Sequence, residues 1–220
     1  MGIVRVKICG LTRIEDINYA IDSGADAVGF IFGYPDSPRN ISFKKIAELI
    51  AKVPPYVSSV VVSPASNNGL VRVIDEIRPS YLQLYSEKPN GMRIKSASVI
   101  ETVHVATDSS ANSLISRCME LSRSCRGLFL DSVSKKKSSS GENLLGGTGV
   151  THDWSLSRRI RDAIYPFPVI LAGGLNERNV REAINVVQPF AVDVSSGVEV
   201  KPGIKDKTKV MEFIQNAKSA

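Results

Sequence analysis

The chain repeats one unit about eight times: a short β-branched strand, a polar or glycine-bearing turn, and an amphipathic helical stretch. Strands that alternate with helices form a parallel sheet, and eight such strands can close into a (βα)8 barrel. We therefore predict an α/β fold, a single (βα)8 TIM barrel over residues 1–220, with an open doubly wound sheet as the alternative. The predicted strands are 4–9, 27–32, 58–62, 81–85, 101–106, 127–131, 168–173 and 190–195. The predicted helices are 13–23, 42–52, 69–77, 110–124, 155–164, 176–187 and 207–217, with a weaker one near 88–97.

Polar side chains recur on one face of several predicted strands. Gln83 and Tyr85 alternate with leucines, Asp131 does so on another strand, and Asp193 alternates with valines. Parallel strands that are buried on both faces normally carry apolar residues throughout. We therefore expect these polar groups to converge near the carboxyl ends of the strands, at the mouth of the barrel.

The first predicted strand places Arg5, Lys7 and Cys9 on one face, and Cys9 ends the strand just before Gly10. Reactive groups of α/β enzymes lie at such strand ends. Most free cysteines are small core residues, so packing is the alternative for Cys9. The neighbouring cation Lys7 favours the reactive interpretation, because a positive charge stabilises a thiolate.

Asp131 ends an apolar strand and should be partly buried, which would raise its pKa and make it a proton donor. The alternative is a structural carboxylate that accepts hydrogen bonds from nearby backbone N–H groups. Across a barrel mouth, Cys9 and Asp131 would face each other as a base and an acid that flank one substrate. No metal-ligand spacing is visible, so the pair suits an isomerisation by proton transfer.

Three glycine-rich segments follow late strands, at 146–149, 173–174 and 195–197. Glycine lets the backbone approach a ligand closely and point N–H groups at it, and (βα)8 enzymes usually bind phosphate at the seventh and eighth loops. Residues 196–199 could add a short helical turn there. The alternative is that these glycines only close tight turns. The predicted phosphate-binding residues are Gly147, Thr148, Gly173, Gly174, Ser195, Ser196 and Gly197.

The net charge of +6 could attract nucleic acid, but lysines and arginines are scattered except at 135–137 and 158–159, and no nucleic-acid-binding module is recognisable. A phosphorylated small molecule is the expected partner. Cys9, Cys118 and Cys125 are an odd number at no metal-ligand spacing, and the last two suit helix packing. No apolar run approaches the ~20 residues of a membrane span. No targeting leader is seen, so we expect a cytoplasmic protein.

Residues 132–145 are rich in serine and lysine and have no periodicity. They form a loop that is either a lid over the substrate or a solvated linker. We interpret His104, His152 and Trp154 as packing residues.

Several motifs together resemble the phosphoribosylanthranilate isomerase family of tryptophan biosynthesis. They occur in family order and span almost the whole chain. The motifs are Lys7-Ile8-Cys9-Gly10-Leu11-Thr12, Gly24–Phe30, Ser37-Pro38-Arg39, Gln83-Leu84, Leu130-Asp131, Gly146–Gly149, Asp153-Trp154-Ser155, Leu171–Asn176 and Val192–Glu199.

The resemblance implies a cofactor-free Amadori rearrangement of N-(5-phosphoribosyl)anthranilate to 1-(2-carboxyphenylamino)-1-deoxyribulose 5-phosphate, by a monomer or homodimer. It assigns Asp131 as the general acid that protonates the furanose oxygen, and Cys9 as the general base that removes the C2 proton. Arg39 would engage the anthranilate end, with Asp193 close by and Gln83 as a further substrate-binding residue. The glycine-rich loops would hold the phosphate.

The chain departs from the family pattern in several loops. Tyr85-Ser86 stands where His-Gly is usual, Val62-Ser63-Pro64 where Phe-Val-Asn is frequent, and His152 where Phe is usual. Val150 replaces a common lysine. These departures leave the shape of the anthranilate pocket open.

Two other functions compete with this one. The sister isomerase of histidine biosynthesis uses paired aspartates and two phosphate sites, which the Cys–Asp pair and the single set of phosphate loops disfavour. A basic, non-enzymatic phosphate- or nucleic-acid-binding barrel is the second alternative. The joint presence of Cys9, Arg39 and Asp131 argues against it.

Overall fold

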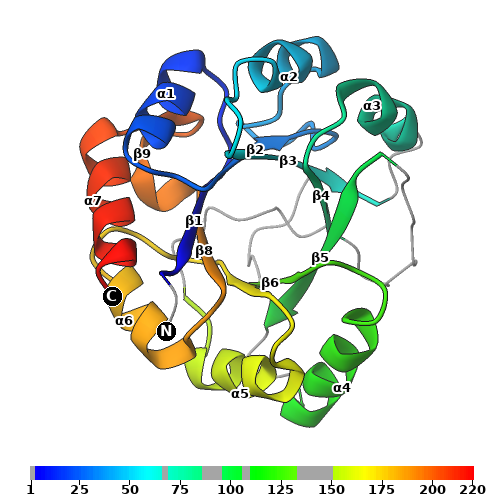
Figure 1. The fold of residues 1–220 in the computed structure, drawn as a ribbon, viewed down its shortest axis with the longest axis vertical. Coiled ribbons are helices and arrows are strands. Elements are labelled where there is room, and N and C mark those ends of the chain that lie inside the picture. Colours follow the sequence, from blue (N-terminus) through cyan, green and yellow to red (C-terminus); the bar gives the residue numbers. More distant parts are fainter. Residues whose placement is uncertain (1–2, 66–68, 86–95, 106–109, 133–150) are drawn as a thin grey trace.

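The computed structural model describes residues 3–65, 69–85, 96–105, 110–132 and 151–220. Eight parallel strands form a closed barrel in sequence order, and helices surround it (Figure 1). This closure confirms the predicted barrel and excludes the open doubly wound sheet. The barrel strands are β1 (Arg5–Ile8), β2 (Ala27–Ile31), β3 (Ser58–Pro64), β4 (Tyr81–Tyr85), β5 (Ser98–Val105), β6 (Leu128–Ser132), β7 (Val169–Leu171) and β8 (Ala191–Val194). The helices are α1 (Ile14–Asp22), α2 (Phe43–Ile50), α3 (Leu70–Ile77), α4 (Ala111–Leu121), α5 (Trp154–Ile164), α6 (Val180–Val187) and α7 (Lys207–Lys218).

The barrel closes where β1 pairs with β2 on one side and with β8 on the other, and Lys7 lies opposite Asp193 in this last ladder. The Cys9 N–H donates to the carbonyl oxygen of Val194 at 2.8 Å, one residue beyond the end of β1. Cys9 is therefore fixed at the carboxyl end of the first strand, as its position in the sequence predicts.

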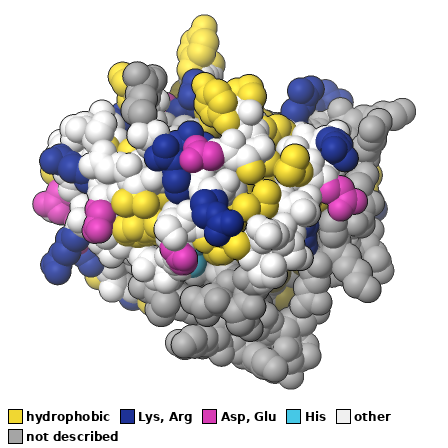
Figure 2. Space-filling view, turned by 90° about the horizontal axis from the view of Figure 1, so that it is seen from below, with side chains coloured by type: hydrophobic (Ala, Val, Ile, Leu, Met, Phe, Trp, Pro, Cys, Tyr) yellow, Lys and Arg dark blue, Asp and Glu magenta, His cyan; other side chains and the backbone are white. Residues whose placement is uncertain are grey.

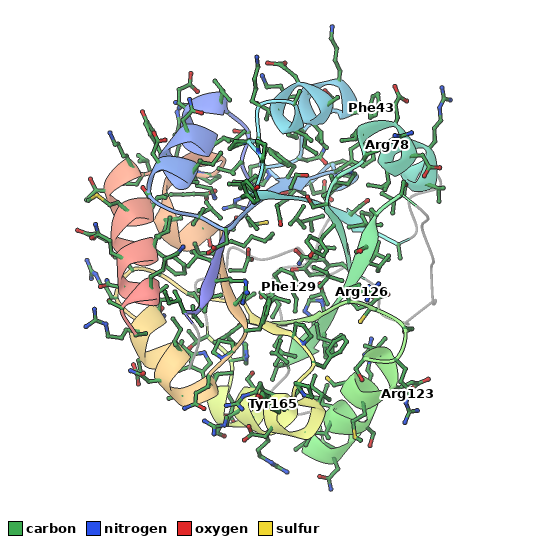
Figure 3. The ribbon with its side chains drawn as sticks, in the orientation of Figure 1. Phe43, Arg78, Arg123, Arg126, Phe129 and Tyr165 are labelled. Atoms are coloured by element: carbon green, nitrogen blue, oxygen red, sulfur yellow. The ribbon has the colours of Figure 1, made fainter. Side chains whose placement is uncertain are left out.

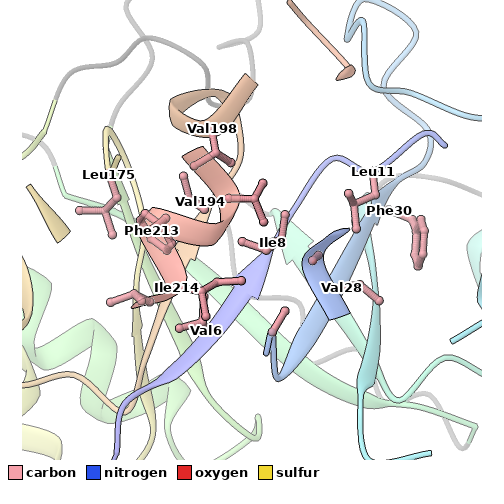
Figure 4. Close-up of a cluster of buried hydrophobic side chains, with 14 of the residues drawn as sticks. Val6, Ile8, Leu11, Val28, Phe30, Leu175, Val194, Val198, Phe213 and Ile214 are labelled. Atoms are coloured by element: carbon pink, nitrogen blue, oxygen red, sulfur yellow. The ribbon is translucent and has the colours of Figure 1, made fainter. Parts of the chain in front are cut away.

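The main hydrophobic core lies between the outer face of the barrel and the helices. Ile8 of β1 and Val194 of β8 pack in one buried cluster with Phe213 and Ile214 of α7 (Figure 4). The aliphatic residues of β4, β6 and β8 point outward into this layer and its neighbour, which confirms the predicted alternation. Burying each such side chain contributes roughly 1.5–3 kcal/mol.

A smaller apolar cluster lies in the barrel interior near the amino ends of the strands. Phe129 of β6 points into the ring of strands (Figure 3) and is fully buried. The cluster consists of Tyr81, Ile100, Phe129, Ile170 and Ala191. It closes the interior from below, so the polar residues that follow on the same strand faces lie toward the opposite end.

Several element boundaries differ from the prediction. Helix α6 begins at Val180 instead of 176, because the Asn176 side chain accepts hydrogen bonds from the N–H groups of Arg178 and Asn179 and forms a turn there. Strand β5 begins at Ser98, three residues before the predicted start at 101. Most of the weak helix near 88–97 lies outside the described residues. Cys118 is buried in α4 as predicted, but Cys125 lies beyond the end of that helix.

A short hairpin after β8 was not predicted. It begins after η1 (Ser196–Val198), the short helical turn that was predicted at 196–199. The hairpin strands β9 (Glu199–Lys201) and β10 (Ile204–Lys205) pair antiparallel. The Thr12 hydroxyl donates to the carbonyl oxygen of Gly203 at 2.7 Å, so the hairpin is joined to the loop after β1.

One side of the surface carries lysines and arginines interspersed with acidic and hydrophobic side chains (Figure 2). Among the described residues, no helix has the length and apolar character needed to cross a membrane.

Candidate active site

A pocket lies at the carboxyl ends of the barrel strands. Every predicted site residue that the structure describes lines it, from loops after β1, β2, β7 and β8 and from β4, β6 and β8 themselves. Gly147 and Thr148 lie outside the described residues, as does nearly all of the 132–145 loop. The predicted lining residues are Cys9, Arg39, Gln83, Asp131, Gly173, Gly174, Asp193, Ser195, Ser196 and Gly197.

Cys9 is buried and packs with Ile31 and Val62 in a small apolar cluster. Gly29 on β2 makes room for it: a Cβ at residue 29 would lie only 2.8 Å from Sγ of Cys9 and 2.9 Å from Cε of Lys7. Burial raises the pKa of the Cys9 thiol, and the neighbouring Lys7 lowers it only in part. The expected stabilisation of the thiolate by Lys7 is therefore present, but desolvation outweighs it.

Lys7 and Asp193 form a buried ion pair across the β1–β8 ladder, with Nζ and Oδ1 2.8 Å apart. Burial favours the neutral amine, but the charges and hydrogen bonds of Asp193 and Cys9 outweigh it and raise the pKa of Lys7 to about 12. Nζ also lies 5.0 Å from the centroid of the Phe129 ring. A permanent cation thus lies beside the Cys9 sulfur.

Asp131, on β6, is buried with both carboxylate oxygens engaged. Oδ1 accepts a hydrogen bond from the backbone N–H of Ser132 at 2.7 Å, and Oδ2 accepts one from the hydroxyl of Tyr85 at 2.5 Å. Burial raises the pKa of the Asp131 carboxyl group above its usual range, although the Tyr85 hydrogen bond and His104 oppose the rise. The direction agrees with the sequence-based expectation for a proton donor.

Arg39 belongs to a second buried charge cluster at the mouth. Its Nε and Nη2 donate to the two carboxylate oxygens of Glu199 at 2.8 and 2.6 Å, and Lys205 donates to the same carboxylate at 2.9 Å. Burial favours the neutral acid, but Arg39 and Lys205 outweigh it and lower the pKa of Glu199. Within the described residues Nη1 of Arg39 has no hydrogen-bond partner, so one edge of the guanidinium group can bind a ligand anion.

The glycine segments after β7 and β8 meet on one side of the pocket. Gly173 and Gly174 have positive φ values of 83° and 67°, a conformation that L side chains rarely adopt. Beside them the Ser195 hydroxyl is buried and has no hydrogen-bond partner among the described residues, and the same holds for Oε1 of Gln83. Buried polar atoms are normally paired, so these two point to a polar ligand.

Comparison with known proteins agrees with this geometry. The profile of the N-(5'-phosphoribosyl)anthranilate (PRA) isomerase family matches residues 6–216. An N-(5'-phosphoribosyl)anthranilate isomerase from Halorubrum lacusprofundi is 43% identical over 216 residues, which cover 97% of this chain and 96% of the relative. The chain belongs to the N-(5'-phosphoribosyl)anthranilate isomerase family. Its resemblance to enzymes that perform this isomerisation in tryptophan biosynthesis is therefore confirmed.

Solved structures of N-(5'-phosphoribosyl)anthranilate isomerases have the same fold. Two structures of the Thermotoga maritima enzyme, one described as monomers derived from a dimer, are 36% and 38% identical, cover 99% of this chain and 100% of theirs, and give TM-scores of 0.80 and 0.79. A third structure, with 36% identity, a TM-score of 0.78 and the same coverage, holds reduced 1-(o-carboxyphenylamino)-1-deoxyribulose 5-phosphate.

Three residues of the pocket region were missed by sequence reasoning. The sequence predicts that Tyr85 faces the barrel mouth but gives it no role at the site, and it places Glu199 only in a short turn and at the end of a family motif. Lys205 was not singled out, although its side chain is completely buried beside Glu199. Asp193 and Arg39 line the same pocket, but they do not pair with each other: Asp193 forms an ion pair with Lys7, and Arg39 forms one with Glu199.

The two histidines differ: His104 makes a packing contact, as predicted, whereas His152 also forms hydrogen bonds. His104, on β5, lies with its ring centroid 5.5 Å from that of Tyr85. His152, a departure from the isomerase family, hydrogen-bonds Ser132 through Nδ1 at 3.1 Å and Ser157 through Nε2 at 2.6 Å. Burial lowers the pKa of His152 to about 4, so its ring is neutral at pH 7. Trp154 packs against the main core, as predicted.

Proposed function

We propose that the chain converts N-(5'-phosphoribosyl)anthranilate into 1-(2-carboxyphenylamino)-1-deoxyribulose 5-phosphate by general acid–base catalysis. The observation that carries this proposal is the convergence of Cys9, Asp131 and two glycine segments on one pocket. We assign the whole chain as one catalytic domain, and a phosphorylated small molecule as its partner rather than nucleic acid. Its three free cysteines suit the reducing cytoplasm.

Asp131 is the proposed acid. In this step a proton moves from its carboxyl group to the furanose oxygen, the bond between that oxygen and C1 breaks, and an iminium ion forms. Burial supports the role because it keeps part of the carboxyl population protonated nearer neutral pH. The negative charge left on Asp131 is stabilised by the donors on its two oxygens, Ser132 N–H and Tyr85 O–H.

Cys9 is the proposed base that removes the C2 proton and leaves an enolamine, which tautomerises to the ketone. A thiol with a raised pKa is a strong base once ionised, but only a minor fraction is ionised at pH 7. The buried Lys7 ammonium is the compensating group, because it favours the thiolate from a fixed position.

Binding of the substrate is assigned to two groups of pocket residues. Arg39 offers Nη1 to the anthranilate carboxylate while Glu199 fixes the guanidinium plane. The backbone at 173–174 and 195–197, with Gly147 and Thr148, is the proposed phosphate site. Gln83 and Asp193 also line the pocket and are assigned as further substrate-binding residues.

The test follows the loss of anthranilate-type fluorescence when purified protein acts on freshly prepared substrate. Cys9→Ser and Asp131→Asn should each lower kcat by roughly 10²–10⁴-fold, because each removes a proton-transfer group. The matched controls are Cys125→Ser, at a half-buried thiol outside the pocket, and Asp162→Asn, at an exposed side chain of α5; both should keep full rate. An inactive wild-type protein, or full activity in both site variants, would overturn the proposal.

The oligomeric state is proposed only as monomer or homodimer. Sedimentation velocity at several protein concentrations distinguishes the two states, and a larger assembly would contradict the proposal.

A further inference from the structure

The Tyr85 side chain reaches from β4 across a neighbouring strand to the carboxyl group of Asp131. Strand β5 lies between β4 and β6 in the barrel, so the two residues belong to strands roughly 10 Å apart. The Tyr85 ring passes beside His104 of β5, and its hydroxyl lies 2.5 Å from Oδ2 of Asp131. A shorter side chain at residue 85 would not reach the Asp131 carboxyl group across β5.

The hydrogen bond completes the fixation of the carboxyl group. With the Ser132 N–H on Oδ1 and the Tyr85 hydroxyl on Oδ2, both oxygens of Asp131 have a donor, and the carboxyl plane is defined by two contacts. Ser132 follows Asp131 directly in the chain, so its N–H is local, whereas Tyr85 is 46 residues away. Among the described residues, the orientation of the carboxyl group therefore depends on one tertiary hydrogen bond.

We propose that Tyr85 is a positioning residue that holds Asp131 in the orientation for proton transfer and stabilises the carboxylate left when the proton departs. This inference rests on the proposed function, in which Asp131 is the acid. The phenol stabilises the charged product of the step more than its neutral start, because a hydrogen bond to an ionised group is the stronger one.

The titratable groups around Asp131 come from several strands. Tyr85 of β4 and His104 of β5 lower the pKa of the Asp131 carboxyl group, whereas burial and the charge of Asp193 on β8 raise it. Burial and the charges of Asp131, Asp193 and Cys9 raise the pKa of the Tyr85 phenol well above its usual range. Tyr85 therefore stays protonated and remains a donor throughout the working pH range.

The alternative is that Tyr85 only fills space at the pocket. Its ring packs edge-on against Tyr34 at 6.4 Å and contacts the small cluster that contains Cys9, Ile31 and Val62. Tyr85→Phe keeps this packing and removes only the hydroxyl, so it separates the two roles. Tyr81→Phe is the matched control, because Tyr81 lies on the same strand face at the far end of the barrel interior.

The experiment measures Asp131 directly. The 13Cγ resonance of Asp131, assigned by its absence in Asp131→Asn, is titrated in wild type, Tyr85→Phe and Tyr81→Phe. In Tyr85→Phe the midpoint should move upward by about one pH unit or more, because a donor to the carboxylate is lost. In the fluorescence assay its kcat should fall about tenfold, with a smaller change in KM. Tyr81→Phe should leave the midpoint unchanged.

An unchanged midpoint in Tyr85→Phe would overturn the inference, and so would a shifted midpoint with an unchanged kcat. If Tyr85→Phe does not fold, wild-type protein labelled at tyrosine 13Cζ provides the readout. The Tyr85 resonance should then report the Asp131 titration and lose that step in Asp131→Asn; a flat Tyr85 resonance would contradict the contact. The titration of Asp131 needs no substrate. A protein that fails to isomerise phosphoribosylanthranilate would therefore disprove the proposed function, while the titration would still test the contact between Tyr85 and Asp131.

Discussion

The two sides of the barrel mouth hold their carboxylates in different ways. On the side of β1, β8 and the β9–β10 hairpin, Asp193 faces Lys7, and Glu199 faces both Arg39 and Lys205. On the side of β4 to β6, Asp131 is held by neutral donors, the Tyr85 hydroxyl and a backbone N–H.

This difference separates two tasks. Compensated charges keep a group ionised and fixed, which suits the recognition of an anionic substrate. A buried carboxyl group with only neutral donors has a pKa that burial can raise, which suits the transfer of a proton. Under the proposed function, the ion-pair side would bind the substrate and support Cys9, and the side with neutral donors would supply the acid.

The largest expected effect comes from breaking the charged side with Glu199→Gln. This change leaves Arg39 and Lys205 buried without their counter-charge, so the free energy of unfolding should fall by about 3–5 kcal/mol. Urea denaturation followed by circular dichroism at pH 7 measures it. A loss below about 1 kcal/mol would mean that the cluster is not a desolvated charge network.

Gly173→Ala tests the place where the two sides meet. Gly173 has a φ of +83°, and a Cβ there would contact Ser132 and lie 2.8 Å from Oδ1 of Asp131. We expect a loss of about 2–3 kcal/mol in unfolding free energy from backbone strain, together with a lower kcat because Asp131 must move. Gly127→Ala is the control, since its nearest contact is the end of the Ile170 side chain at 3.2 Å. Equal losses in the two variants would contradict the expectation.

The fold and the position of the site could be predicted from the sequence because both depend on local patterns. The strand–helix alternation indicated a closed barrel, and polar residues that alternate with apolar ones on β4 and at the ends of β6 and β8 indicated which face points inward. The thiol at the end of β1 was placed correctly because strand ends in a parallel barrel share one mouth.

The charge and hydrogen-bond partners could not be predicted in the same way. Arg39 and Glu199 are 160 residues apart, and the contact of Tyr85 with Asp131 depends on the register across β5. The balance at Cys9 also requires the structure: Lys7 is visible two residues away in the sequence, but the desolvation that outweighs it is a property of the closed barrel.

His152 gives the neutral side a pH dependence that can be measured. Its pKa is about 4 in the folded protein and about 6.5 in the unfolded chain, so between these values the unfolded state binds more protons and stability falls as the pH falls. From pH 7 to pH 5 this contribution is up to about 2 kcal/mol. Denaturant unfolding at both pH values should show a smaller difference in His152→Phe than in wild type. Parallel behaviour of the two proteins would show that His152 is not buried as a neutral ring.

The smallest expected effect comes from repeating the Glu199→Gln chemistry on an exposed ion pair. Glu48 of α2 lies 3.0 Å from Lys45, but both side chains are largely exposed, at 59% and 41%. Water solvates both charges in the folded protein, and it still solvates Lys45 when the Glu48 charge is removed. Glu48→Gln should therefore alter the free energy of unfolding by less than about 0.5 kcal/mol. Urea denaturation under the same conditions compares Glu48→Gln with Glu199→Gln. Because the side-chain change is identical, the difference between their losses of unfolding free energy reports the effect of burial. If Glu48→Gln cost as much as Glu199→Gln, the loss of an acidic group alone would explain both results, and the distinction between the two sides of the mouth would lose its electrostatic basis.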